Sequence, residues 1–144
     1  MNIETYYFGE LDVKDERVLS FEAGLPGFLD ERQFVLLDLP DNPTFHVLQS
    51  VQTPEVAFIV TNPHLFYKDY EFVIEDKVVD ILQIENEEQV SILSIVTLRE
   101  PFSQSTINLQ APIVINTKQQ VAKQVILNNE GFTTKHPLLT ESRV

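Results

Sequence analysis

The chain has 144 residues, a length typical of one globular domain that buries a substantial core. It contains no cysteine, which excludes disulfide bonds, thiolate nucleophiles and zinc sites built on thiolates. Its formal net charge of −12 disfavours direct contact with nucleic acid or anionic lipid, because both are themselves negatively charged.

The acidic charge has two interpretations. It attracts a basic partner and speeds their encounter, but the same charge also keeps a small protein soluble. The longest apolar runs, such as residues 57–60, are far shorter than the ~20 residues that a membrane span needs. Residues 1–10 carry acids and no basic segment, so we expect no signal peptide, and the lack of cysteine favours the cytoplasm.

The first part of the chain has the pattern of short strands separated by turns. Within the tight loop of this part, Pro26 fixes φ and Gly27 supplies a positive φ, which is typical of a β-turn. Asp30 is the expected cap of a single helical turn. In chain order, the predicted elements are a strand at residues 3–8, a return strand at 17–21, the tight loop at 24–28, the helical turn at 30–32, a buried strand at 33–39, a turn at 40–43, and strands at 45–50 and 56–61.

The second part of the chain contains the only serious competition between helix and strand. Apolar residues recur at helical spacing in residues 76–84, and Asp76 is placed to cap a helix there. In chain order, the predicted elements are a turn at residues 62–63, a short helical or irregular segment at 64–70, a short strand at 72–74, the helix at 76–84, a loop at 85–88, a central strand at 90–98, a loop at 99–105, a long strand at 106–116, a turn at 117–120, a strand at 121–127 and a turn at 128–131.

The most regular pattern lies in residues 106–116. Every second side chain there is apolar, as in a strand with one face on a core: Ile107, Leu109, Ala111, Ile113 and Ile115. Pro112 cannot donate a ladder hydrogen bond, so we expect this long strand to bend near residues 111–112 and to wrap around the core.

No repeat or linker divides the chain, and strands with turns every eight to twelve residues favour an all-β barrel or sandwich. We therefore predict one all-β domain over residues 1–144. It is expected to be a small β-barrel-like domain of strongly bent antiparallel strands with one or two short helical segments. From about residue 137 we expect a flexible tail.

The residues that usually carry chemistry are sparse. His46, His64 and His136 are far apart and lack the spacing of metal ligands, so we expect no metal site. No serine lies in a nucleophile elbow and no cysteine is present, so we expect no catalytic residue, no cofactor and no enzymatic activity. Acids such as Asp30 and Glu31, or Glu71 and Glu75, keep one alternative open, a small barrel enzyme or ligand carrier with paired buried carboxylates.

The tight loop at residues 24–28 also has two interpretations. Its two glycines lack the third glycine, the lysine and the long helix of a phosphate-binding loop. It is either a simple turn or a rigid loop that displays Leu25 and Phe28 to a partner.

Four stretches, taken in order, resemble the flagellar assembly factor family FliW. They are GLPGF at residues 24–28, LQS at 48–50, NLQAPIVIN at 108–116 and QVIL at 124–127. The resemblance extends from about residue 6 to residue 139. It implies a cytoplasmic, non-enzymatic, β-barrel-like protein that binds flagellin and the RNA-binding translational regulator CsrA. In this family, FliW prevents CsrA from repressing flagellin mRNA, and accumulating flagellin releases CsrA by partner switching.

The resemblance also suggests where partners bind. We expect partners to bind at the tight loop, at the turn of residues 62–63 and at polar positions of 108–116, where residues occur that a core does not demand. The chain is expected to be monomeric on its own, and a flagellin chaperone without a major regulatory role is the related alternative. The candidate partner-binding residues are Leu25, Pro26, Phe28, Asn62, Pro63, Asn108, Gln110 and Asn116.

Overall fold

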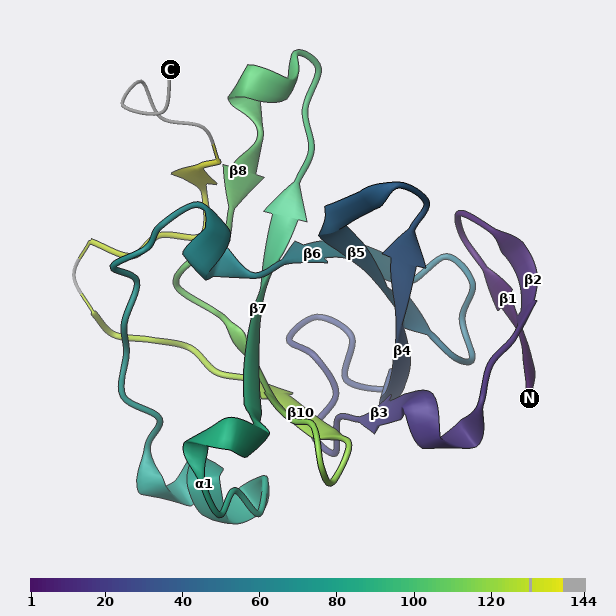
Figure 1. Cartoon of the computed structure of the whole chain (residues 1–144), viewed down its shortest axis with the longest axis horizontal. Coiled ribbons are helices and arrows are strands. Elements are labelled where there is room, and N and C mark those ends of the chain that lie inside the picture. Colours follow the sequence, from purple (N-terminus) through teal and green to yellow (C-terminus); the bar gives the residue numbers. More distant parts are fainter. Residues whose placement is uncertain (130, 139–144) are drawn as a thin grey trace.

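The computed structural model describes residues 1–129 and 131–138, and its main feature is a strongly curled β-sheet with little helix (Figure 1). The all-β prediction is therefore confirmed. The strands are β1 (Asn2–Thr5), β2 (Gly9–Asp12), β3 (Val18–Ser20), β4 (Gln33–Leu39), β5 (Asn42–Ser50), β6 (Ala57–Thr61), β7 (Val90–Thr97), β8 (Thr106–Ile107), β9 (Ile113–Asn116), β10 (Val121–Gln124) and β11 (His136–Pro137). The helices are α1 (Asp76–Ile81) and four 3₁₀ turns, Asp15–Arg17, Pro63–Leu65, Glu87–Gln89 and Phe102–Gln104.

Seven strands close into a ring. β3, β4, β5, β6 and β7 pair in sequence and antiparallel, β7 pairs with β9, and β9 pairs with β10. β10 then returns to β3 through Val121 and Ser20, in a parallel pairing that departs from the expected antiparallel pattern. β8 pairs with the end of β7 and, on its other edge, with β11, which lies outside the ring. Figure 1 looks through this barrel-like ring.

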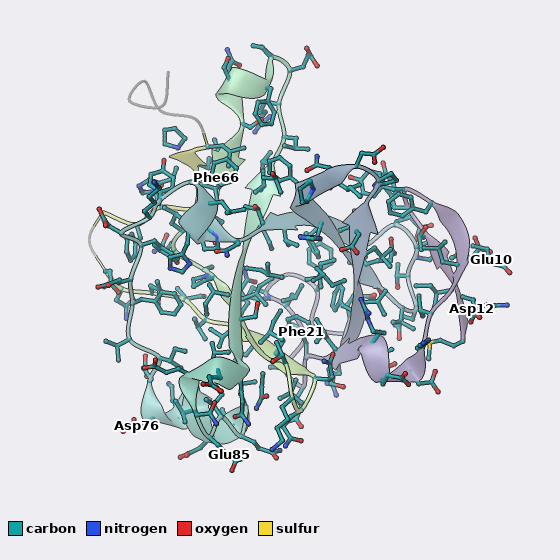
Figure 2. The ribbon with its side chains drawn as sticks, viewed as in Figure 1. Glu10, Asp12, Phe21, Phe66, Asp76 and Glu85 are labelled. Atoms are coloured by element: carbon teal, nitrogen blue, oxygen red, sulfur yellow. The ribbon has the colours of Figure 1, made fainter. Side chains whose placement is uncertain are left out.

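The interior of the ring is filled by side chains. Phe21 and Phe34 are completely buried, with ring centroids 5.2 Å apart, and Phe21 points into the ring in Figure 2. Burying each such ring stabilises the fold by about 1.5–3 kcal/mol. A filled interior opposes the alternative of a ligand carrier. The other buried members of this cluster are Leu19, Leu25, Leu48, Val60, Leu93, Ile113, Ile115 and Ala122.

The single long strand predicted for residues 106–116 is wrong, although its buried face is right. The chain forms β8 and β9, separated by residues 108–112. Asn108 causes the break, because its side-chain oxygen accepts hydrogen bonds from the backbone N–H groups of Gln110 (3.1 Å) and Ala111 (2.9 Å). The five alternating apolar side chains are nevertheless all buried, as the pattern predicted.

The N-terminal prediction also needs correction. β1 ends at Thr5, whose hydroxyl accepts from the Phe8 N–H (2.9 Å) and donates to the Gly9 carbonyl (2.7 Å). This turn starts β2, which the sequence reading missed and which pairs with β1 in a separate two-stranded sheet. The predicted return strand at residues 17–21 exists as β3, but it pairs with β4 and β10.

Three smaller predictions are wrong in part. Residues 30–32 form no helical turn, because Glu31 is buried and hydrogen-bonded instead. Residues 72–74 are extended but pair with no strand of the described chain. The predicted helix exists as α1, yet it ends at Ile81 because Gln83 takes a positive φ of 55°.

The first two residues of the predicted flexible tail, 137 and 138, are part of the fold. Pro137 pairs with Thr106, and Leu138 is completely buried and donates its N–H to the Ser105 carbonyl (2.9 Å). Residues 139–144 of the predicted tail, and residue 130 of the predicted turn at 128–131, lie outside the described residues.

Candidate functional site

The loop at residues 24–28 is a hydrogen-bonded β-turn, as its sequence predicts. The Phe28 N–H donates to the Leu25 carbonyl at 2.7 Å, and the Leu25 N–H donates back at 3.3 Å. Gly27 has a φ of 85°. Gly24 has a φ of 67°, and a Cβ there would lie 2.5 Å from the Leu29 carbonyl oxygen, so only glycine fits.

A buried carboxylate fixes the base of this loop. Glu31 accepts hydrogen bonds from the hydroxyls of Ser50 (2.5 Å) and Thr53 (2.9 Å). Ser50 closes β5, so the bonds tie the loop to the barrel wall through the LQS stretch. The loop is therefore held rigidly, which lowers the entropy cost of presenting its side chains to a partner.

The loop faces residues 108–111 and the chain that leaves β10, and a hollow of about 230 Å³ lies between them. On one side, the Phe28 ring stands edge-on to Phe58, with centroids 5.4 Å apart, and Phe28 remains 41% exposed. We call this hollow the loop groove. It is lined by Leu25, Pro26, Phe28, Phe58, Ile95, Asn108, Ala111, Gln124 and Ile126.

The loop groove has no charged lining residue among those nine. Its polar groups are engaged locally, since the Gln124 amide donates to the Ala111 carbonyl at 2.9 Å. A second hollow of about 340 Å³ adjoins it, shares Pro26, Gln124 and Ile126, and also has the charged residues Glu75, Lys77 and Lys123 in its lining. With Leu29 and Ile126 about two-thirds exposed, this surface suits apolar side chains of a protein partner.

The structure brings four of the eight candidate residues together in the loop groove, namely Leu25, Pro26, Phe28 and Asn108. Pro26 and Phe28 are exposed, and Asn108 is half-buried. Leu25, however, is only 1% exposed and belongs to the core, so the expectation that the loop displays Leu25 is wrong.

The other four candidates lie outside the groove. Gln110 is half-buried, and Asn62 is exposed and accepts from the His64 N–H at 2.9 Å. Pro63 is buried in the 3₁₀ turn that follows. Asn116 is completely buried, so it and Pro63 are not available at the surface, contrary to expectation.

Asn116 has a structural role instead. Its amide donates to the carbonyls of Leu82 (2.7 Å) and Gln83 (3.1 Å), which end α1. Its oxygen accepts from the N–H groups of Lys118 and Gln119 in the turn to β10. One buried side chain thus joins a helix end, a strand and a turn.

The lining residues that sequence reasoning missed are Ala111, Phe58, Ile95, Gln124 and Ile126. The QVIL stretch contains the last two and was a usable signal. Phe58 and Ile95 gave no such signal, because the pairing of β6 with β7 places these strand residues beside the loop.

Nothing in the described part of the chain is arranged like a catalytic or metal centre. No group of three His, Asp or Glu residues there could hold a metal ion. Glu31 is the one buried acid among the described residues, so no pair of buried carboxylates forms there. Burial raises the pKa of Tyr70, whose hydroxyl donates to the Leu109 carbonyl at 2.6 Å. Of the described helices, none has the length and apolarity to cross a membrane.

Comparison with known proteins identifies the family. The family model described as FliW protein matches residues 2–138. The chain belongs to the FliW family. It is 49% identical over 135 residues to the flagellar assembly factor FliW of Oceanobacillus iheyensis, covering 94% of this chain and 92% of that protein. It is 46% identical over 142 residues to the FliW of Bacillus subtilis, covering 99% of both chains.

The fold agrees with a solved structure as well. A crystal structure of the flagellar assembly factor FliW matches with a TM-score of 0.93 and 42% sequence identity, covering 98% of this chain and 99% of that one. The resemblance drawn from the four sequence stretches is therefore confirmed, as is the curled β fold that it implied.

Proposed function

We propose that this FliW-family chain is a non-enzymatic flagellar assembly factor that acts in the cytoplasm by binding CsrA and flagellin. Bound to the chain, CsrA no longer represses flagellin mRNA, and accumulating flagellin displaces CsrA. The chain acts as a monomer before it binds either partner. The observation that carries this proposal is the loop groove, an uncharged apolar surface on a rigid loop of a strongly acidic protein.

The loop groove has the properties of a protein-docking centre. Its exposed aromatic, Phe28, is the type of side chain that concentrates binding energy at interfaces. Pro26 and Asn108 flank it, and Gln110 and Asn62 are candidates for the periphery. Competition between CsrA and flagellin follows directly if both use this groove.

The acidic surface supports the effect on CsrA. Apart from Glu31, every described Asp and Glu is exposed, and Figure 2 shows Glu10, Asp12, Asp76 and Glu85 pointing outward. An RNA-binding protein is basic where it holds RNA. A partner of net charge −12 docked near that surface would oppose the approach of phosphates without occupying the RNA site.

Calorimetric titration of the purified chain with CsrA and flagellin, separately and together, tests the proposal. We expect both proteins to bind and flagellin to displace CsrA. Binding to flagellin alone would favour a dedicated flagellin chaperone. Failure to bind either protein would overturn the proposed function.

A further inference from the structure

The barrel wall has an open strand edge. β6 pairs with β7 only opposite residues 94–96, whereas β9 pairs with residues 90–93 of β7 on the other edge. β6 ends at Thr61, and the chain continues as the 3₁₀ turn Pro63–Leu65, which lies beside β7 but does not pair with it. β6 therefore covers one edge of β7 at residues 94–96 only. On that same edge, residues 90–93 have no partner strand in the described chain.

The main-chain groups that face this open edge can be identified. The Asn108 N–H donates to the Ile95 carbonyl at 2.9 Å, so Ile95 directs its main-chain groups away from β6. Because hydrogen-bonding direction alternates along an antiparallel strand, Ser91 and Leu93 direct theirs the same way, toward β9. The N–H and C=O groups of Ile92 and the C=O group of Val90 consequently face the open edge, whereas the Val90 N–H donates to the Glu87 carbonyl.

A second extended segment lies across from this edge. The backbone of residues 71–74 makes no hydrogen bond to another part of the described chain. Its Phe72 and Ile74 side chains join Val90 and Ile92 in one apolar cluster, whereas Val73 is 86% exposed.

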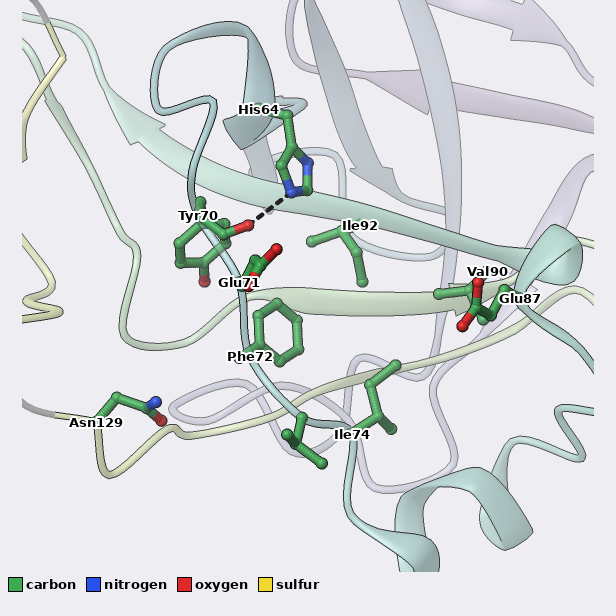
Figure 3. Close-up of a pocket in the computed structure, with 10 residues that line it drawn as sticks. His64, Tyr70, Glu71, Phe72, Ile74, Glu87, Val90, Ile92 and Asn129 are labelled. Carbon is green, nitrogen blue, oxygen red and sulfur yellow. Dashed lines mark hydrogen bonds between the residues drawn. The ribbon is translucent and has the colours of Figure 1, made fainter.

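Between the two segments lies an open hollow of about 640 Å³, which we call the edge hollow. Figure 3 shows Glu71, Phe72 and Ile74 on one side and Val90 and Ile92 on the other. At one end, His64 Nε2 is hydrogen-bonded to the Tyr70 carbonyl at 2.9 Å, which holds the crossing segment in place.

The charge of the edge hollow is one-sided. Glu71 and Glu87 line it and are both exposed, and no lysine or arginine is among its lining residues. The edge hollow combines main-chain groups without a partner in the described chain, apolar side chains at its base and carboxylates at its rim. Together these features define the complementary ligand. It is an extended peptide that carries both apolar and basic side chains.

We propose that the edge hollow binds a short, basic, extended segment of a partner protein, which adds to β7 as a strand in line with β6. Residues 90–93 accommodate about four ligand residues, or ~13 Å of strand. The ligand backbone pairs with Ile92 and with the Val90 carbonyl, its apolar side chains meet Phe72 and Ile74, and its basic side chains meet Glu71 and Glu87. This goes beyond the proposed function, because it does not depend on which protein supplies the segment.

A fluorescein-labelled hexapeptide of alternating lysine and valine is the probe, and the hexapeptide of alternating glutamate and valine is its matched control. Both are titrated into the full ¹⁵N-labelled chain. We expect the lysine peptide to bind and to shift the amide resonances of Val90, Ile92 and residues 71–74. Equal binding of both peptides, or shifts confined to other residues, would overturn the proposal.

Two double variants test the contribution of the two glutamates at the rim of the edge hollow. Charge reversal by Glu71→Lys with Glu87→Lys is expected to weaken lysine-peptide binding by about tenfold. Glu16→Lys with Glu55→Lys makes the same change in net charge at exposed positions outside the hollow, and it should weaken binding much less. Equal losses in the two double variants would show a non-specific charge effect and overturn the proposal.

A peptide N-methylated at alternate residues, which cannot donate all its main-chain hydrogen bonds, should lose binding; retained affinity would exclude strand addition. These peptide results stand apart from the titrations with CsrA and flagellin. A peptide that fails to bind counts against the edge hollow alone, whereas failure of both proteins counts against the proposed function.

Discussion

The loop groove and the edge hollow adjoin the same strand but offer opposite kinds of surface. Ile95 of β7 lines the first, and Val90 and Ile92 line the second. In the loop groove, the turn satisfies its own main-chain groups and the lining carries no charge. In the edge hollow, the main-chain groups of Ile92 have no partner strand in the described chain, and the rim is acidic.

This difference separates two modes of recognition. An uncharged apolar groove selects side chains by shape, and its affinity depends weakly on salt. An open strand edge recognises backbone, tolerates many sequences and relies on rim charge for selectivity. One barrel wall can therefore support a contact that selects particular side chains and a contact that tolerates many sequences. A substitution in one surface can remove its contact and leave the other.

The largest expected effect comes from the loop at residues 24–28, which forms one side of the loop groove. Gly24→Ala should destabilise the fold by about 3 kcal/mol, because it combines a positive φ with a clash against the Leu29 carbonyl. Gly27→Ala should cost about 1–2 kcal/mol, since its φ is also positive but its Cβ would meet open space. Urea unfolding measures both, and equal losses would contradict the close approach at Gly24.

Asn116→Ala tests the side of the barrel that bears the edge hollow. Removing its amide leaves the Leu82 carbonyl and two turn N–H groups without their partner, so we expect a loss of about 2 kcal/mol. The exposed Asn128→Ala serves as control in the same unfolding experiment. If both variants lose equal stability, the structural role of Asn116 is wrong.

Salt should weaken two electrostatic effects, binding of the lysine peptide and antagonism of CsrA. Raising the ionic strength from about 0.05 to about 0.5 M should weaken lysine-peptide binding several-fold, because rim charges become screened. Antagonism of CsrA should weaken in the same direction, as measured by displacement of labelled RNA. An antagonism that is independent of salt would count against the electrostatic mechanism.

The smallest effect concerns Ser94, which lies on β7 between the residues that line the two surfaces. Its hydroxyl is buried without a hydrogen-bond partner. Ser94→Ala should therefore leave stability unchanged or raise it by up to about 1 kcal/mol. Calorimetric melting beside Ser91→Ala, a half-buried neighbour, measures this, and a clear loss for Ser94→Ala alone would contradict it.

The parts of the fold that local pattern determines were predictable. The apolar run of β4 gave its bounds, and the Pro26-Gly27 pair gave the β-turn with its positive φ at Gly27. The alternation of apolar residues identified the buried face of residues 107–115. Every second side chain there is buried even though the strand hydrogen bonds are interrupted between β8 and β9.

The parts that depend on side-chain hydrogen bonds were not predictable in this way. Asn108 breaks a strand and Thr5 ends one by bonding to nearby backbone, which competes with the ladder. Asn116 looked like a surface residue because asparagine is usually exposed, but three backbone segments converge on it. For the candidate site, the motif residues were found, whereas Phe58 and Ile95 required knowledge of strand pairing.

Phe28→Ala, titrated with CsrA and with flagellin, tests the central claim that the loop groove is the docking surface. Phe102→Ala is the matched control: Phe102 is 43% exposed against 41% for Phe28, and each ring contacts one other phenylalanine, Phe45 or Phe58 respectively. We expect both variants to melt at similar temperatures, with Phe28→Ala alone weakening binding of both proteins by about tenfold or more. Unchanged binding of both proteins by a folded Phe28→Ala variant would contradict the account.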